Sequence, residues 1–470
     1  MLDENELRTL IGDMWALHLT ELGWLDRIYG YVKGLRGVPA VPEESGQEVK
    51  DLARLSVKNV LGLVRDSFAQ NLSVVGYRRP TDKTDDAAWK LWQANRMDAR
   101  QAEVYRPALT YGAAYVTVTP GDSGPVFRPR SPRRLLAVYK DANLDAWPQY
   151  ALETWIDKTD AKPQRKGLLY DERYLYPLDL GEIAQGDDGA VRSATQPVAV
   201  REFGVPFEHG ATADGKPVCP VIRFVNDRDA DDMIVGEIAP LLVLQQAINS
   251  VNFDRLLTSR FGAHPQKVIT GWEGTETEAK RASSLRVWTF DDPDVKVQSF
   301  PAAAIEPYNS LLTEMLEHVA MVAQISPARV TGQMVNISAE ALAAAEADQQ
   351  RKLAAKRESF GEAWEQALRL AAEMDGDSET AADHAAEVVW RDTEARSFGA
   401  VVDGVTKLAN VGVPIEELLY MVPGMTQQQM QSIREARAAA PKSPPSRGNG
   451  DAGETETPPA AAAESTNLPA

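Results

Sequence analysis

The strongest candidate for nucleophilic chemistry is Gly121-Asp122-Ser123-Gly124-Pro125, which places a serine in a glycine-rich turn, as the nucleophile of a protease can be. That chemistry also needs a histidine base and a carboxylate that orients it. His18 is the one histidine upstream, and it falls on the apolar face of an expected helix rather than after a strand. A polar turn between two strands therefore explains these residues better, and a hydrolase using Ser123 is the weaker alternative.

An acidic run before an expected helix is the strongest candidate for a metal site. Its carboxylates are Asp227, Asp229, Asp231, Asp232 and Glu237. An EF-hand calcium loop requires glycine at its sixth position and glutamate at its twelfth. Here Asp232 and Ile238 stand at those positions. We therefore expect a solvated acidic turn near a helix N-terminus and assign no metal ligand. Binding of a divalent ion to this run remains an open alternative.

Other catalytic signatures are missing from the sequence. It contains no Gly-rich loop ending in Gly-Lys-Ser/Thr and no dinucleotide-binding fingerprint. The single cysteine, Cys219, does not pair at ligand spacing with any histidine; the histidines are His18, His209, His264, His318 and His384. The sequence therefore predicts a protein that is not an enzyme and that uses no cofactor.

The bulk composition predicts a folded protein of two or three domains, because 470 residues exceed one ordinary core. Its 44% hydrophobic content is normal for a globular chain. The formal charge of −18 argues against tight DNA binding but not against a wall that surrounds DNA, since an acidic wall repels phosphate. We expect no secretory signal, no membrane span and a reducing compartment.

Residues 1–235 predict an α+β body. Helical spacing of apolar residues runs from Leu10 to Leu25, and two further helices are expected over 47–71 and 85–111, with Pro107 kinking or ending the latter. Short β-branched and aromatic runs separated by turn residues then predict strands over 113–118, 135–139, 150–156, 168–176, 198–203 and 221–225.

Two long apolar helices, expected over 236–261 and 302–325, flank a compact insert over 262–301 with strands at 267–270 and 286–290. Helices that leave a body and return in this way resemble a stalk, which suggests assembly more than turnover. An ordinary helical hairpin packed in a large monomer is the alternative.

A loop over 326–337 follows, in which Gly332 to Asn336 are uncharged and flexible. An Ala-rich helix is then expected from Ser338 to about Met374, with Asn336 and Ser338 as candidate N-caps. A strand over 387–390 and a helix-rich segment over 396–440 come next. Beyond Pro441 the tail is rich in Pro, Ala, Ser and Thr, and we expect it to be disordered.

The order and spacing of these elements resemble the portal (head-to-tail connector) proteins of tailed bacteriophages, in the branch found in siphophages of Gram-positive hosts. The resemblance covers about residues 5–437. The segments that carry it are Val221-Ile222-Arg223-Phe224-Val225-Asn226, Gly236-Glu237-Ile238 with the helix to Ala263-His264-Pro265-Gln266-Lys267, Val330-Thr331-Gly332 through Asn336-Ile337-Ser338-Ala339-Glu340-Ala341-Leu342, and Trp390-Arg391-Asp392.

The resemblance implies a mainly helical portal fold with named parts. The wing would be 1–235 with 340–391, the stem helices 236–261 and 302–325, the clip 262–301, the tunnel loop 326–339, the crown 392–437 and the disordered tail 438–470. It implies one subunit of a probably twelve-membered ring at a capsid vertex of the virion, assembled in the host cytoplasm. Double-stranded DNA would be packaged and ejected through the ring. The other implied partners are the large terminase subunit, a head-tail adaptor, the major capsid protein and a scaffolding protein, with no membrane.

Site residues follow from this resemblance. The DNA-facing tunnel loop would present Arg329, Gly332, Gln333, Met334, Val335 and Asn336. Subunit contacts of the stem would involve Leu241, Ile248, Leu312 and Leu316, and clip docking would involve Lys267, Trp272, Arg286 and Trp288. A monomeric helical scaffold or adaptor protein of the virion is the alternative function.

Overall fold

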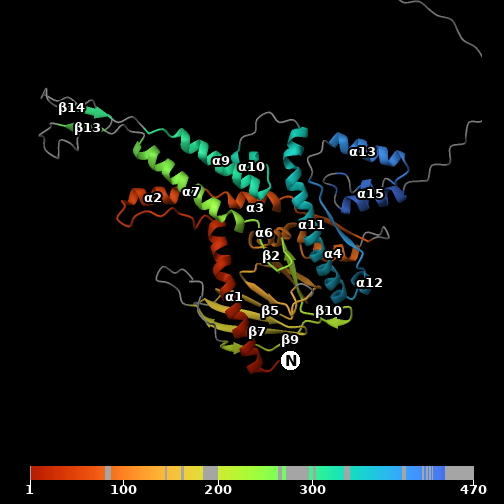
Figure 1. The fold of residues 1–470 in the computed structure, drawn as a ribbon. Helices are drawn as coiled ribbons and strands as arrows, with labels where there is room; N and C mark the ends of the chain where they lie inside the picture. The colour runs from red at the N-terminus through yellow and green to blue at the C-terminus, as the bar shows by residue number, and fades with distance from the viewer. Residues whose placement is uncertain are drawn as a thin grey trace, which may run out of the picture.

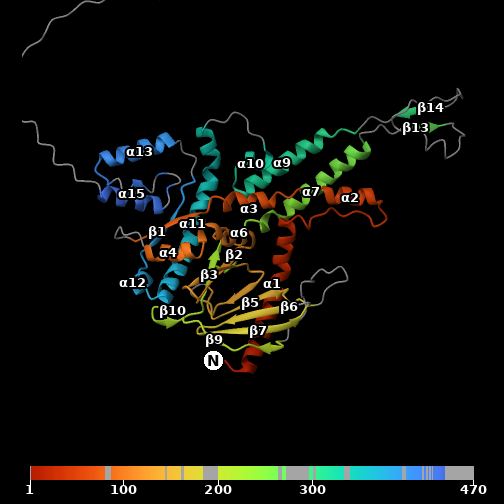
Figure 2. The same ribbon diagram turned by 180° about the vertical axis from the view of Figure 1, so that it is seen from behind.

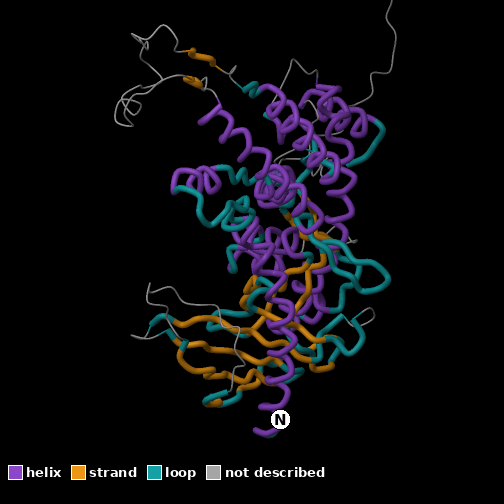
Figure 3. Tube along the Cα trace, turned by 60° about the vertical axis from the view of Figure 1, so that its left-hand side comes forward, coloured by secondary structure: helices purple, strands orange, loops and turns teal. Residues whose placement is uncertain are grey.

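The largest sheet lies at one end of the molecule, and most of the helices lie above it (Figure 3). The computed structural model describes residues 2–79, 86–142, 146–159, 163–183, 200–262, 267–270, 296–299, 303–332, 339–393, 398–414, 418–419, 422, 425 and 427–439. Helices and strands are mixed throughout the body, which confirms the predicted α+β class.

Helix α1 (Glu4–Val32) lies along one face of a six-stranded sheet (Figure 1). Its start is fixed by a capping box, in which Asp3 and Glu6 each accept a hydrogen bond from the other's backbone amide. The strand order is β4-β5-β6-β7-β8, with β9 also beside β7. The strands are β4 (Leu135–Val138), β5 (Tyr150–Asp157), β6 (Gln164–Tyr170), β7 (Tyr174–Glu182), β8 (Glu202–Phe203) and β9 (Phe207–Glu208).

A second sheet has β2 (Ala113–Thr119) as its central strand, between β12 (Val221–Val225) and β3 (Val126–Arg130), all antiparallel. All of β2 is buried, because one face packs against the first sheet and the other against helices. The run at 113–118, apolar except for Thr117, is typical of a strand buried on both faces, and the predicted strand is confirmed. The small hairpin β10 (Thr212–Ala213) and β11 (Lys216–Pro217) lies between β9 and β12 in the chain.

Helix α11 (Ala339–Asp375) crosses the body and contributes aromatic side chains to the main core. The Trp364 ring lies 4.8 Å from that of Trp92 and 4.7 Å from that of Phe224, measured between centroids. Its indole Nε1 donates to the Tyr105 hydroxyl at 2.9 Å. The pair β1 (Val74–Arg78) and β15 (Glu387–Trp390), with α12 (Ser378–Ala381), completes this region.

Two expected helices are divided. The segment 47–71 forms α2 (Gln47–Leu55) and α3 (Leu61–Ala69). The segment 85–111 forms α4 (Asp86–Ala94), α5 (Met97–Arg100) and α6 (Ala102–Tyr111). One break falls at Arg96, which has φ 55°, and a second at Gln101, between α5 and α6. Helix α6 runs through Pro107 and ends at Tyr111, before Gly112 with φ 102°, so Pro107 does not end the helix.

The strand expected over 168–176 is also wrong in extent, because a hairpin turn separates β6 from β7. Asp171 makes this turn: its Oδ1 accepts hydrogen bonds from the backbone amides of Arg173 at 2.7 Å and Tyr174 at 2.5 Å. Of the strand expected over 198–203, residues 202 and 203 form β8, and 198–199 lie outside the described residues.

A pair of helices projects from the body, with α13 (Phe398–Asn410) and α15 (Gln427–Ala439) on the opposite side (Figures 1 and 2). The pair consists of α7 (Leu242–Leu257) and α9 (Glu306–Ala323). A short 3₁₀ turn, Ala239–Leu241, leads into α7, and a π-helical turn, Thr258–Gly262, follows it. Strands β13 (Lys267–Thr270) and β14 (Lys296–Ser299) pair antiparallel at the far end, and α10 (Pro327–Thr331) follows α9. Among the described residues, the helices are too short or too polar to cross a membrane.

Candidate functional site

The inner faces of α7 and α9 belong to the core of this chain. Leu241, Ile248, Leu312 and Leu316 are all buried within the main core of the described chain. We expected these four residues to contact neighbouring subunits, and the structure instead gives them partners in their own chain. The difference has a simple reason: an apolar stripe shows that a helix face is covered, but not which chain covers it.

Other apolar side chains of the helix pair point away from this core. Val243 on α7 is 78% exposed and Met321 on α9 is 68% exposed. Val322 and Leu311 of α9 are exposed as well. The pair therefore has a buried apolar face within this chain and, in addition, a few exposed apolar side chains among its polar positions.

The polar side of α7 binds backbone groups of the segment that links α1 to α3. Gln245 accepts from the Val60 amide at 3.1 Å and donates to the Lys58 carbonyl at 2.6 Å. Asn249 accepts from the Lys58 amide at 3.0 Å and donates to the Gly37 carbonyl at 2.9 Å. Asn252 donates to the Ser56 carbonyl at 2.7 Å. These buried bonds hold the projecting helices to the body and explain why the expected helix over 47–71 is interrupted at 56–60.

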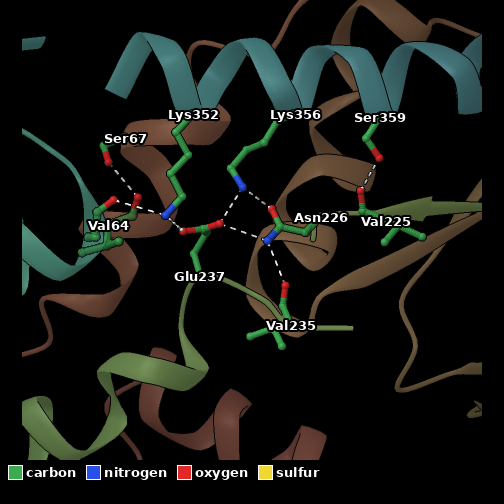
Figure 4. A network of polar contacts seen from close by, with 10 residues as sticks. Val64, Ser67, Val225, Asn226, Val235, Glu237, Lys352, Lys356 and Ser359 are labelled. Atoms are coloured by element: carbon green, nitrogen blue, oxygen red, sulfur yellow. Dashed lines mark hydrogen bonds and ion pairs between the residues drawn. The ribbon is translucent and has the colours of Figure 1, made fainter. Parts of the chain in front are cut away.

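A buried ionic network lies at the base of the helix pair (Figure 4). Glu237, just before α7, contacts Lys356 through Oε1 and Lys352 through Oε2, each at 2.5 Å. Asn226, at the end of β12, accepts from Lys356 at 2.7 Å and donates to Glu237 at 3.0 Å. The network thus joins the second sheet, the start of α7 and helix α11. Glycine is required beside it, because a Cβ on Gly236 would lie 2.6 Å from the Thr110 carbonyl oxygen.

The network keeps Glu237 ionised. Burial by itself raises the pKa of this carboxyl, but the charges of Lys356 and Lys352 outweigh burial and hold the pKa below its ordinary value. Burial also lowers the pKa of Lys356, and the charge of Glu237 offsets part of that effect. Neither lysine was among the candidate residues of the sequence. Lys356 stands between the core residues Leu353 and Phe360 on the buried side of α11, and a lysine at such a position indicates a buried ion pair.

The segment after α9, expected to be a loop, begins with helix α10 and ends it at Gly332, which has φ 73°. Arg329 is in α10, and its guanidinium pairs with Glu346 of α11 at 2.8 Å. Gln333, Met334, Val335 and Asn336 lie outside the described residues, as does Ser338.

At the far end of the helix pair, the strand expected over 267–270 is confirmed as β13, which begins at Lys267. Its partner is β14, and the expected strand over 286–290 lies outside the described residues. Trp272, Arg286 and Trp288 also lie outside them. The docking role of these three residues therefore stays a prediction.

The described residues bring together neither a hydrolase site around Ser123 and His18 nor a metal site in the acidic run 227–237. Ser123 lies in the turn between β2 and β3, whereas His18 is buried on α1 beside Trp15. In the acidic run, Asp232 pairs with Arg228 at 2.7 Å, Asp229 binds the backbone amides of Asp231 and Met233, and Glu237 faces the lysines. Within the described ranges, no group of three or more His, Cys, Asp or Glu side chains is placed to hold a metal ion.

Comparisons with known proteins agree with the resemblance seen in the sequence. The model of the family described as phage portal protein, SPP1 Gp6-like, matches residues 69–443. The portal protein of Mycobacterium phage D29 is 26% identical over 376 residues, covering 74% of this chain and 71% of that protein. The portal protein of Mycobacterium phage L5 is 26% identical over 369 residues, with the same coverage of both chains.

Two solved structures are more distantly similar. A chain in the virion of a native gene transfer agent particle has a TM-score of 0.46 at 12% identity and covers 82% of this chain and 95% of that chain. A chain in the neck of an empty gene transfer agent particle has a TM-score of 0.45 at 12% identity and covers 80% and 92%. Since the family model matches more than half of the sequence, this chain belongs to the phage portal protein family of the SPP1 Gp6-like type.

Proposed function

We propose that this chain is one subunit of a ring of twelve copies, through which double-stranded DNA is packaged into a capsid and later ejected. Membership of the portal family gives the chain a portal role at the capsid vertex. The ring, its subunit number, its assembly in the host cytoplasm and the passage of DNA belong to the proposal.

The observation that carries the proposal is the helix pair α7 and α9, which projects from the body (Figure 1). Hydrogen bonds and the Glu237–Lys356 ion pair hold its base, and it carries exposed apolar side chains. We assign 236–261 and 302–325 as the stem, 262–301 as the clip, 326–339 as the tunnel loop, 1–235 with 340–391 as the wing, 392–437 as the crown and 438–470 as a tail. Exposed Val243 and Met321 support a ring, because a stem helix in a ring must contact neighbours on both sides.

Weak binding to DNA is expected of a conduit. The charge of −18 per chain opposes static binding of phosphate, and a ring multiplies that charge. Arg329 supports this interpretation. It is a cation within the proposed tunnel loop, and its charge is already paired with Glu346. The path would therefore guide DNA by repulsion and shape rather than hold it.

Partners follow from the same assignment. The clip would bind the large terminase subunit during packaging and a head-tail adaptor afterwards. The wing would contact the major capsid and scaffolding proteins. ATP hydrolysis would belong to the terminase, since this chain has no nucleotide-binding loop of the Gly-Lys-Ser/Thr kind.

The native mass of the purified chain, with negative-stain images of the same peak, tests the proposal. A ring near twelve times 51.5 kDa with a central hole is the expected result. A monomer at every salt concentration, in the presence of scaffolding protein as well as alone, would contradict the ring and favour a monomeric adaptor of the virion.

A further inference from the structure

A cavity of about 400 Å³ lies in the seam between the two sheets of the body, far along the chain from the helix pair. One wall comes from β3, the edge strand of the three-stranded sheet, and the other from β5 and β6 of the six-stranded sheet. This volume is in the range of pockets that hold small ligands or a few residues of a peptide.

The wall from β3 is basic. Arg128 and Arg130 are two positions apart on this strand, so their side chains leave the same face, and Arg134 adds a third guanidinium from just before β4. Glu153 is the one carboxylate among the residues that line the cavity. Three cations against one anion make this seam a local exception in a chain whose net charge is −18.

Glu153 is already committed to structural partners. It is nearly fully buried, and its Oε1 lies 2.5 Å from Arg130 and 3.7 Å from Arg134. Its Oε2 accepts a hydrogen bond from the Tyr170 hydroxyl at 3.0 Å. Arg130 with Glu153 is therefore a built-in ion pair, whereas Arg134 is about half exposed and Arg128 donates to the Thr119 hydroxyl. Both arginines keep further donors for an incoming anion.

The rest of the lining is apolar and aromatic. Trp155 follows Glu153 by two positions on β5, so both side chains are on the cavity side of the sheet. Phe207 of β9 is 49% exposed at the cavity, beside Leu168 and Leu175. An anion held by the arginines would have an apolar surface next to it.

We propose that this cavity binds an acidic peptide of a partner protein, with one carboxylate on Arg128 and Arg134 and an adjacent aromatic or aliphatic side chain against Trp155 and Phe207. The forked guanidinium groups match the two oxygens of a carboxylate. Apolar contact beside a charged anchor is typical of peptide recognition.

The alternative occupant with similar chemistry is a nucleotide, with phosphate on the arginines and a base on Trp155. The charge distribution favours the peptide. Buried Glu153 opposes a doubly charged phosphate more than a singly charged carboxylate, and the net charge of the chain repels a polyanion. A local excess of two positive charges instead matches one or two carboxylates.

Ligand-observed NMR on the full chain tests this proposal with two matched probes, N-acetyl-Phe-Glu-Leu amide and N-acetyl-Phe-Gln-Leu amide. We expect the glutamate peptide to bind with a dissociation constant below about 10 mM and roughly tenfold more tightly than the glutamine peptide. The double variant Arg128→Gln/Arg134→Gln should weaken the glutamate peptide by roughly tenfold. Phe207→Ser, a change at an exposed position, should weaken it as well.

The double variant Arg54→Gln/Arg173→Gln is the matched control, because it also removes two positive charges, from exposed positions that do not line the cavity. It should leave peptide binding unchanged. The proposal would be overturned if the two peptides bound equally, or if neither peptide bound at about 10 mM. It would also be overturned if both Arg128→Gln/Arg134→Gln and Phe207→Ser bound the glutamate peptide as tightly as the parent. Tighter binding of thymidine 5′-phosphate than of the glutamate peptide would also overturn it and assign the cavity to nucleotides. The readout does not require a ring, so its failure is distinct from failure of the proposed portal function.

Discussion

Glu237 and Lys356 lie 2.5 Å apart and are both almost completely buried, where α11 crosses the chain leading into α7. This pair links the projecting helices to the longest helix of the described body. Because a buried charge without its partner is strongly unfavourable, the pair fixes how the two parts meet. The segment 326–339 joins the same two parts, since it runs from the end of α9 to the start of α11.

Glu237→Gln should lower the free energy of unfolding by about 3 kcal/mol, because it leaves the ammonium groups of Lys356 and Lys352 without their shared anion. Urea unfolding followed by circular dichroism measures this change. Adding Lys356→Met to Glu237→Gln should recover part of the loss. Lys407→Met is the control, since its pair with Asp403 is exposed and should change stability little. A Glu237→Gln variant as stable as the parent would contradict a role for the network.

His18 should make the protein sensitive to acid. Burial, helped by the charge of Arg165, lowers its pKa from 6.5 to about 4. In the unfolded chain the His18 imidazole therefore binds a proton below pH 6.5, whereas in the folded chain it binds that proton only near pH 4. The contribution to stability is present above pH 6.5 and is lost as the pH falls toward 4, amounting to about 3 kcal/mol in full.

Replacing His18 with phenylalanine should flatten the fall in stability between pH 6.5 and 4, as measured by thermal melts across that window. His384→Gln is the matched control, because His384 is exposed and should leave the pH dependence unchanged. Identical pH profiles for His18→Phe and the parent would show that another group causes the acid sensitivity.

Changes to the exposed and to the buried apolar residues of the helix pair should have different effects. Val243→Asp and Met321→Asp should abolish the proposed ring with little effect on the melting temperature, because both side chains are exposed in the single chain. Leu312→Asp should instead impair folding, because it places a charge in the core. Native mass spectrometry and thermal melts separate the two outcomes.

Val205→Asp is the control for these substitutions, since Val205 is exposed but lies before β9, outside the helix pair. It should preserve both ring and stability. Intact rings from both Val243→Asp and Met321→Asp would exclude the outer surface of the pair as the subunit contact.

Gly236→Ala should destabilise the base of the helix pair by about 2 kcal/mol or more, because the new methyl group would meet backbone atoms that cannot move independently. Gly12→Ala makes the same change within α1, where the methyl group meets open space, and should be neutral or stabilising. Urea midpoints of the two variants provide the test. Equal midpoints would mean that the close approach at Gly236 relaxes at no cost.

The local sequence pattern was sufficient to predict a helix or strand where the buried side chains of the segment recur at a regular spacing. The apolar spacing from Leu10 to Leu25 predicted that a helix exists at α1, and the β-branched run of β2 and the Ala-rich α11 predicted their elements close to the observed bounds. The sequence by itself also determined the family resemblance, which rests on the order of its motifs. The hairpin at Asp171 had a local signal, an aspartate able to cap a turn, which the strand prediction overlooked.

Tertiary structure alone decided the pairings. The break between α2 and α3 depends on Gln245, Asn249 and Asn252, which bind the backbone at 56–60 from almost two hundred residues away. Leu312 shows the same limit, because its apolar character required burial but could not specify whether its own chain or a neighbour would cover it. The role of Lys356 likewise depends on its ion-pair partner Glu237, which lies outside α11. Periodicity reports the environment of a side chain, whereas partners distant in sequence are fixed only when the chain folds.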